Sequence, residues 1–325
     1  MRARFWGTRG SLPVSLTAEA VRDKIANALL AADGRRFAGI DEARAFASGL
    51  PFATAQTFGG QTSCVEVELS PPSDTESQEY LLCDLGSGAR VFGNAVLARH
   101  GPRTPNTFHI FISHLHWDHI MGFPFFTPAY IPGNRIVIHG CHAELELAFR
   151  RQQAPPSFPV VFEQLAATIE FVTLTPGETY RVAGVAVTPM LQLHGGDSYG
   201  YRFEHAGKVL VYSTDSEHRV DDGAQIAAFA EFFRDADLVI FDAMYSLADS
   251  VSVKADWGHS SNVVGVELCQ LAGARHLALF HHEPIYSDAR ISGVEEESRR
   301  LESITRESAP PLLITAAYDG LVIEL

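Results

Sequence analysis

The sequence of 325 residues predicts an α/β fold that carries its functional groups at the ends of buried strands. Short apolar runs, typical of strands, alternate with stretches of helical periodicity, and several runs end directly in aspartate or histidine. In the clearest case the run 108–112 leads straight into four potential ligands, which are His114, His116, Asp118 and His119. Imidazole and carboxylate groups at this spacing are the ligand set of a borderline divalent metal such as zinc, manganese or iron.

The N-terminal part of the sequence predicts a strand, a turn and a helical insertion. Residues 3–6 predict a short strand, and the Gly-Thr-Arg-Gly-Ser turn after it either places Arg9 near a site or uses it structurally. Within residues 15–57, helical spacing from Val21 to Ala32 and from Asp41 to Ser48 predicts two helices. We expect this insertion to be a cap or an oligomer contact, or else a neutral surface elaboration.

The next segments predict strands that end in polar residues. A hairpin joins a strand at 65–67 to one at 80–83 through a Pro- and Ser-rich loop at 70–78, and Asp84 follows its second strand. A strand at 134–139 and a helix at 142–151 come next. A predicted strand at 185–193 is followed directly by His194. A predicted hairpin of strands 199–203 and 208–212 comes next, and Asp215 lies shortly after it.

The C-terminal part repeats this design. A helix at 225–234 precedes the strand 238–241, which ends at Asp242. His259 stands just before a helix that runs to residue 271 with Ser260 or Ser261 as its N-cap. The strand 277–280 ends at a pair of adjacent histidines, 281 and 282. An exposed acidic helix at 287–307 and a hairpin that turns at residues 319–320 complete the chain.

The segment 113–119 resembles the His-x-His-x-Asp-His signature of the metallo-β-lactamase superfamily. Residues 120–124, Ile-Met-Gly-Phe-Pro, resemble its continuation in ribonuclease Z and related phosphodiesterases. The resemblance covers about residues 3–14 and 58–283 and leaves the helical insertion unexplained. It implies a single domain over residues 1–325, folded as an αββα four-layer sandwich.

The resemblance also implies two divalent metal ions, zinc first, with manganese or iron as alternatives. By this resemblance, one ion is bound by His114, His116 and His194 and the other by Asp118 and His119, and Asp215 bridges the two ions. The final ligand is His281 or His282, because successive strand residues point to opposite faces. The family pattern Thr-His-x-Ser-Pro favours His281.

Three further roles are expected from the same comparison. Asp84 would orient a ligand histidine, or it caps a turn before the next helix. His259 would be a catalytic proton donor paired with Asp242, or it caps the helix that follows it. With Asp118, these two residues form the predicted catalytic set.

The predicted function is hydrolysis by a dinuclear metal centre, which suits phosphodiesters. The leading expectation is a phosphodiesterase acting on a small substrate such as a cyclic nucleotide. A carboxyl-ester or lactone hydrolase is the nearest alternative, because the same centre attacks carbonyl groups. An RNA-processing nuclease and a non-catalytic metal-binding regulator are the remaining alternatives.

The composition limits the kinds of partner and the cellular compartment that we expect for this protein. The net charge is −14 with histidines neutral, and the sequence has no run of Lys and Arg, so a nucleic-acid polymer is not expected as a partner. Four scattered cysteines suggest neither a disulfide framework nor a Cys-type zinc site, and a reducing cytoplasm fits best. No apolar run is long enough to cross a membrane. A homodimer is a further expectation, since related enzymes commonly form one.

Overall fold

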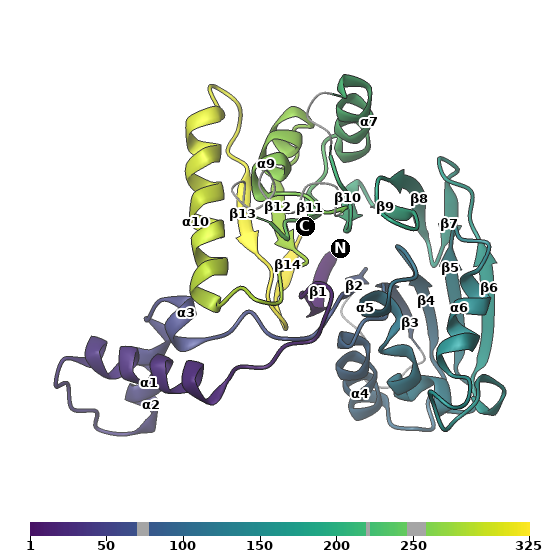
Figure 1. Cartoon of the computed structure of the whole chain (residues 1–325), viewed down its shortest axis with the longest axis horizontal. Coiled ribbons are helices and arrows are strands. Elements are labelled where there is room, and N and C mark those ends of the chain that lie inside the picture. Colours follow the sequence, from purple (N-terminus) through teal and green to yellow (C-terminus); the bar gives the residue numbers. More distant parts are fainter. Residues whose placement is uncertain (70–77, 219–221, 246–257) are drawn as a thin grey trace.

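The computed structural model describes residues 1–69, 78–218, 222–245 and 258–325. Within these ranges two seven-stranded sheets pack face to face, and helices lie on their outer faces (Figure 1). This arrangement is the predicted αββα sandwich. Every helix in the described ranges is too short or too polar to span a membrane.

The first sheet contains the N-terminal strands and the last strand of the chain. Its order is β14 (Val322–Glu324), β1 (Arg2–Gly7), β2 (Cys64–Glu68), β3 (Glu79–Cys83), β4 (Thr107–Phe111), β5 (Arg135–Gly140) and β6 (Thr168–Thr173). Strands β3 to β6 are parallel. The helices α4 (Gly88–His100), α5 (Trp117–Ile120) and α6 (Leu145–Gln152) belong to this half.

The second sheet is built from the C-terminal half. Its order is β13 (Leu313–Ala316), β12 (His276–Phe280), β11 (Leu238–Asp242), β10 (Lys208–Ser213), β9 (Ser198–His205), β8 (Val185–Gln192) and β7 (Tyr180–Val182). Strands β10 to β13 are parallel. The helices α7 (Gly223–Phe233), α9 (Asn262–Leu271) and α10 (Asp288–Thr305) cover its outer face.

Side-chain alternation along each strand separates an inner core from two outer ones. On β4, Phe111 faces the other sheet and packs on Phe203, with 5.3 Å between ring centroids. Phe108 and Ile110 point the opposite way, into the core beneath α4. Residues 108–111 of β4 are all buried, so both faces of this strand are covered, as is usual for strands in a parallel arrangement.

The site lies where the carboxyl ends of strands from both sheets meet. Three residues that directly follow strands, or nearly so, leave them with a positive φ: Asp84 after β3 at 61°, Asp215 after β10 at 49°, and His281 after β12 at 59°. This left-handed conformation is uncommon for residues other than glycine. Such conformations persist where the surrounding structure holds them, and they cluster at functional sites.

Two sequence predictions are wrong. The last two strands do not form a hairpin, because β13 pairs with β12 in the second sheet and β14 pairs with β1 in the first. The acidic helix α10 is not simply exposed, since Ile291 and Val294 on one of its faces are buried. The strands β6 and β7 were not predicted, and most of the predicted loop 70–78 falls outside the described residues.

Residues 11–57, here called the arm, leave the sandwich as an extension (Figure 1). The arm contains α1 (Ala18–Ala32), α2 (Ile40–Ser48) and α3 (Phe52–Ala55), of which the helical spacing predicts the first two. No residue from 11 to 57 is buried. The arm therefore adds nothing to the three cores of the sandwich and is held by contacts near its base.

Candidate metal centre

Three histidines form the first half of a ligand cluster. His114 and His116 lie in the loop after β4, and His194 lies just beyond β8 in the other sheet. Nε2 of His194 is 3.2 Å from Nδ1 of His116, and the ring centroid of His114 is within 5 Å of both other rings. Two nitrogens bound to one tetrahedral zinc at 2.0–2.1 Å would lie about 3.3 Å apart.

Asp118, His119 and His281 form the second half. Oδ2 of Asp118 is 3.3 Å from Nε2 of His119 and 3.2 Å from Nε2 of His281. The two histidine nitrogens are themselves 3.3 Å apart. The spacing of this second group is therefore also that of ligands around one ion.

Asp215 lies between the two groups. Its Oδ2 is 3.6 Å from Nε2 of His114 and 3.8 Å from Nε2 of His194. Its Oδ1 is 3.3 Å from Nε2 of both His119 and His281. One carboxylate oxygen thus faces each group, which is the arrangement that a bridging ligand needs.

The adjacent histidine points elsewhere. Nε2 of His282 donates to the carbonyl oxygen of Ala317 at 2.8 Å, and its ring packs on Phe58. Of the two histidines left open by the sequence, only His281 lies among the other predicted ligands. Gly10 makes room for it, since a Cβ at Gly10 would lie 2.6 Å from the His281 ring.

Asp84 is the centre of a buried hydrogen-bond network. Its carboxylate accepts hydrogen bonds from the Ser113 amide and hydroxyl, from Nδ1 of His119 and from the Tyr212 hydroxyl, all at 2.7 Å. Nδ1 of His114 lies 3.0 Å from the Ser113 hydroxyl oxygen, which can accept its proton. Asp84 therefore orients His119 directly and His114 through Ser113.

These hydrogen bonds also set the tautomers of the ligand histidines. A proton on Nδ1 of His119 and of His114 leaves Nε2 of each ring with its lone pair toward the cluster. His194 is fixed in the same way, because its Nδ1 donates to the carbonyl oxygen of Gly258 at 2.7 Å. Gly258 must be glycine at this contact, since its φ is 79° and a Cβ would lie 2.4 Å from His194.

His259 and Asp242 form a pair beside the ligand cluster. Nδ1 of His259 donates to Oδ2 of Asp242 at 2.9 Å and is 3.8 Å from Oδ2 of Asp215. Burial opposes the charge of His259, but the carboxylates of Asp242, Asp215 and Asp118 together outweigh burial and raise the pKa to about 9. Ser261, not His259, caps α9, because its hydroxyl accepts a hydrogen bond from the amide of Val264.

The electrostatics of the cluster favour a cation. Burial lowers the pKa of His114, His116 and His194, so these imidazoles are neutral and can act as ligands. Burial also opposes charge on His119, but the carboxylates of Asp215 and Asp118 outweigh it and raise its pKa. The second half of the cluster therefore stabilises positive charge.

The residues fit a pair of divalent ions. Five imidazoles and two carboxylates converge, and overlapping triads of them have ligand atoms within 4.8 Å of one another. Nε2 of His114 is buried without a hydrogen-bond partner, although it points at the other ligands. A buried polar atom without a partner is costly, and a metal ion at this position would satisfy it.

Sequence reasoning missed the hydrogen-bond partners Ser113, Tyr212 and Gly258, and it also missed the contribution of the turn after β1. The backbone amide of Ser11 donates to Oδ2 of Asp118 at 2.7 Å. The Gly-Thr-Arg-Gly-Ser turn signalled a sharp turn but not this contact, since any residue except proline has an amide hydrogen. Arg9 itself is structural, because it donates to the carbonyl oxygens of Gly59, Glu283 and Tyr286.

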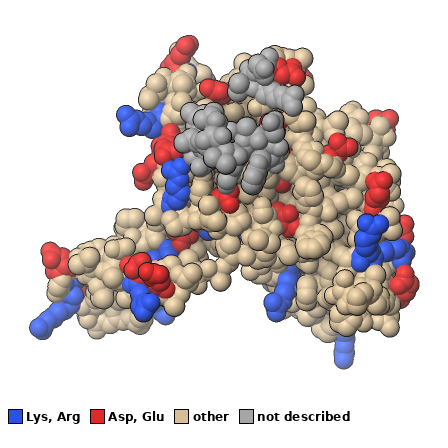
Figure 2. Space-filling model, viewed as in Figure 1, with Lys and Arg blue, Asp and Glu red and all other residues tan. Residues whose placement is uncertain are grey.

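Two exposed apolar side chains are adjacent in sequence to the predicted ligands. Trp117, between two predicted ligands, is 78% exposed, and Leu193 is exposed beside His194. Lys and Arg side chains on the face shown in Figure 2 are scattered among Asp and Glu and form no continuous basic stripe.

Comparisons with known proteins agree with the fold. Residues 80–282 match the model of the beta-lactamase superfamily domain. Ribonuclease Z of Staphylococcus haemolyticus (strain JCSC1435) is 22% identical over 327 residues, which cover 85% of this chain and 97% of the relative.

Two solved structures superpose over almost the whole chain. The metallo-beta-lactamase fold protein YhfI from Bacillus subtilis has a TM-score of 0.61 at 16% identity, covering 99% of this chain and 98% of its own. A diphosphatase from the PhnP family has a TM-score of 0.58 at 19% identity, covering 100% and 97%. At these identities the likeness bears on the fold alone, and it confirms the predicted one.

Proposed function

Because this chain belongs to the beta-lactamase superfamily, a family of metal-dependent hydrolases, we propose that it is a dinuclear phosphodiesterase acting on a small phosphodiester such as a cyclic nucleotide. The observation that carries the proposal is Asp215, with one oxygen toward each group of ligands. The proton donor pair of His259 and Asp242 lies next to it. This combination suits attack on phosphorus followed by departure of an alkoxide.

The two groups of residues have distinct proposed tasks. His114, His116 and His194 would hold one divalent ion, and Asp118, His119 and His281 the other, with Asp215 shared. Zinc fits the nitrogen-rich set, and manganese or iron are alternatives. When bound, two such ions activate water as a nucleophile and stabilise the charge that develops on the phosphoryl oxygens.

The remaining chemistry belongs to the chain. Nδ1 of His259 is occupied by Asp242, so Nε2 is the nitrogen available to give a proton to the leaving oxygen. The carboxylate of Asp242 beside Nδ1 favours the protonated form of His259. Asp242 is fully buried and fixes the orientation of the imidazole in the way that a carboxylate orients the histidine of other acid–base pairs.

The charge of the protein supports a small substrate. A net charge of −14 and a scattered distribution of basic residues disfavour a long polyanion. The similarity to ribonuclease Z favours a second candidate, an RNA-processing nuclease. A carboxyl-ester or lactone hydrolase is the third, since the same centre can polarise a carbonyl group.

One panel of substrates tests these candidates. Metal-loaded protein would be assayed with bis(p-nitrophenyl) phosphate, cyclic nucleotides, p-nitrophenyl esters, lactones and a structured RNA at the same enzyme concentration. We expect turnover of the phosphodiesters to exceed that of the esters, with little cleavage of RNA. Preferred ester or lactone hydrolysis, or RNA cleavage that exceeds cyclic nucleotide turnover, would overturn the proposal in favour of the corresponding candidate.

A further inference from the structure

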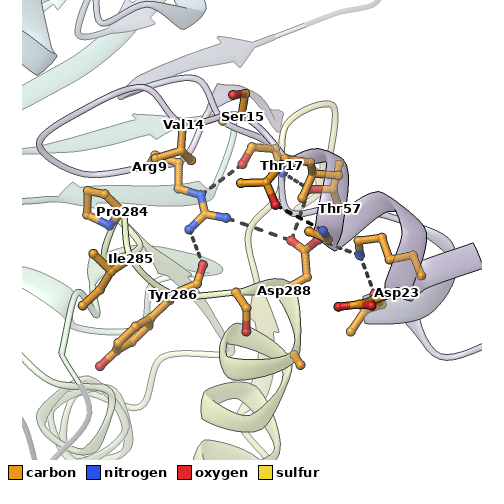
Figure 3. A pocket seen from close by; sticks show the side chains of 18 of the residues that line it. Arg9, Val14, Ser15, Thr17, Asp23, Thr57, Pro284, Ile285, Tyr286 and Asp288 are labelled. Atoms are coloured by element: carbon orange, nitrogen blue, oxygen red, sulfur yellow. Dashed lines mark hydrogen bonds and ion pairs between the residues drawn. The ribbon is translucent and has the colours of Figure 1, made fainter. Parts of the chain in front are cut away.

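A cavity lies at the base of the arm, between α1 and the start of α10 (Figure 3). Its volume is about 470 Å³, and its walls come from residues 9–17, from α1, from residues 53–60 and from residues 284–289. The described residues that line it include none of the predicted metal ligands. Cavities of roughly 300–1,000 Å³ are typical sites for small molecules.

The buried and half-buried charges at the cavity are already paired within the chain. Nζ of Lys24 forms an ion pair with Oδ2 of Asp288 at 2.7 Å, and Oδ1 of Asp288 accepts a hydrogen bond from the Thr57 hydroxyl at 3.1 Å. The guanidinium of Arg9 donates to three backbone carbonyl oxygens. Asp23 is the fourth charged lining residue, and it is exposed to water. Two positive and two negative charges sum to zero, so the cavity favours an uncharged ligand.

Apolar side chains form much of the remaining wall. Val14, Leu16, Ala20, Pro284 and Ile285 all line the cavity. Leu16 is 41% exposed and Ile285 is 81% exposed. A ligand that covered these two side chains would remove apolar surface from water, which favours binding. The ligand expected here is therefore largely apolar as well as uncharged.

The walls of the cavity are held in place by contacts at the base of the arm. The ring of Phe52 in α3 lies 4.5 Å from that of Phe58 and 4.9 Å from that of Tyr318, measured between centroids. Lys24 also donates to the carbonyl oxygen of Gln56 at 2.7 Å. A ligand would thus meet a site that is already formed, as is usual for small-molecule pockets.

One wall of the cavity leads directly to a predicted metal ligand. Arg9 lines the cavity, and two residues later the backbone amide of Ser11 donates to Oδ2 of Asp118 at 2.7 Å. The turn that carries Arg9 therefore contacts the cavity on one side and the metal centre on the other.

A second wall is connected to His281. The amide of Gly10 donates to the carbonyl oxygen of His282 at 3.0 Å, and the amide of His282 donates to the carbonyl oxygen of Thr8 at 3.0 Å. Residues 284–286, which line the cavity, follow these histidines almost directly. The turn after β1 and the segment after β12 are thus joined to each other between the cavity and the metal centre.

We propose that this cavity is a second binding site, which takes a small, uncharged and largely apolar molecule and strengthens metal binding when it is occupied. A ligand packed on Arg9 and residues 284–286 restricts the two segments that position Asp118 and His281. Metal binding must order the same two segments. Each binding event therefore lowers the entropic cost of the other, and the effect is reciprocal.

Two dyes that differ in charge test the kind of ligand. N-phenyl-1-naphthylamine is uncharged, and 1-anilinonaphthalene-8-sulfonate has the same ring system with an added sulfonate. Both become fluorescent in apolar surroundings. We expect one molecule of the uncharged dye to bind per chain, at least about 10-fold more tightly than the sulfonate. Equal affinities, tighter binding of the sulfonate or no binding of the uncharged dye would overturn the proposal.

Substitutions test the location of the site. Ala20→Phe fills the cavity and should weaken binding of the uncharged dye by at least about 10-fold. Ala26→Phe is the matched control, because it makes the same change on α1 at an exposed position that does not line the cavity, and it should bind the dye as the wild type does. Thermal unfolding reports whether each variant is folded.

A milder change keeps the location testable if Ala20→Phe disturbs the arm. Ile285→Ser removes an exposed apolar side chain from the wall and should weaken dye binding by about 5-fold. Dye binding that survives both Ala20→Phe and Ile285→Ser, or that Ala26→Phe weakens equally, would place the dye elsewhere and overturn the proposal.

Metal loading tests the connection to the metal centre. The uncharged dye should bind at least about 5-fold more tightly to metal-loaded protein than to chelator-treated protein. Hydrogen exchange of a peptide that contains Ser11 should slow when the dye binds to the metal-loaded protein. Both readouts are independent of which bond the enzyme hydrolyses. A dye affinity that is the same with and without metal would overturn the connection.

Discussion

Two buried aspartates in different sheets each accept a hydrogen bond from Nδ1 of a histidine. Comparing these two Asp–His pairs shows that the same interaction can have two different uses. Asp84 follows β3 of the first sheet and accepts from His119 at 2.7 Å. Asp242 ends β11 of the second sheet and accepts from His259 at 2.9 Å. Both aspartates are fully buried.

The two histidines differ in what surrounds their second nitrogen. Nε2 of His119 lies 3.3 Å from each of Asp118, Asp215 and His281, and the residue is completely buried. The side chain of His259 retains 11% exposure, and the contacts of its ring to carboxylates are made by Nδ1. Identical pairing thus gives one histidine suited to bind a metal and another suited to transfer a proton. The surroundings of Nε2 decide between these roles.

The largest effect should come from removing a ligand of the group formed by Asp118, His119 and His281. We expect Asp118→Ala to lose activity by at least about 10⁴-fold, because one ion and its share of water activation would be lost. Elemental analysis should find close to two metals per chain in the wild type and close to one in the variant. A fully active Asp118→Ala protein would contradict the ligand assignment.

Removing the proton donor should have a large but selective effect. His259→Ala should keep both metals and lose about 10²–10⁴-fold in turnover of substrates with alkyl leaving groups. The loss should be much smaller for bis(p-nitrophenyl) phosphate, since p-nitrophenolate leaves without a proton. Equal losses on both substrates would count against the proton-donor role. A missing metal would indicate that His259 is a ligand, since it also lies in a group with His194 and Asp215 that could hold an ion.

The two aspartates themselves should separate the two roles. Asp84→Asn should weaken metal binding by about 10–100-fold, because His119 and Ser113 lose their carboxylate partner. Asp242→Asn should leave metal affinity unchanged and lower turnover of alkyl phosphodiesters. Chelator competition measures the first effect and steady-state kinetics the second. If both variants lose metal equally, the proposed difference between the pairs is wrong.

A buried carboxylate without a histidine should affect stability and not activity. Burial, together with Glu68, raises the pKa of Glu66 to about 7, although the indole of Trp6 donates to it at 2.9 Å. The folded state therefore binds this proton more tightly than the unfolded chain, whose pKa stays near 4.5.

The resulting contribution is present below pH 4.5 and is lost as the pH rises through about 7, a change of about 3 kcal/mol. Glu66→Gln should remove it, so the free energy of unfolding of the variant should gain on the wild type between about pH 5 and about pH 7.5. Denaturant titrations at several pH values measure this difference. Parallel pH profiles for the two proteins would show that Glu66 is not the titrating group.

The sequence determined the local parts of the site. His114, His116, Asp118 and His119 stand within six residues, so one loop brings them together in any fold that buries the preceding strand. The positions that end later strands were also visible, because an apolar run followed at once by an acid or a histidine places that side chain at a sheet edge. The superfamily resemblance then supplied the four-layer αββα architecture.

Only the tertiary structure decided which of the available groups meet. Strand alternation predicted from the sequence that only one of His281 and His282 faces the cluster, but both follow the end of β12, and the tertiary structure decides which one it is. The amide of Ser11 donates to Asp118, from which it is 107 residues away in the sequence. The sequence does not reveal such a contact, because every residue except proline has a backbone amide hydrogen. The sequence predicted a hairpin for the final two strands because a turn signal lies between them. Their actual partners, β12 and β1, are farther away in the sequence. Sequence patterns predict the geometry of residues that are close in the sequence. They do not predict these contacts, because the contacts depend on how strands far apart in the sequence pack.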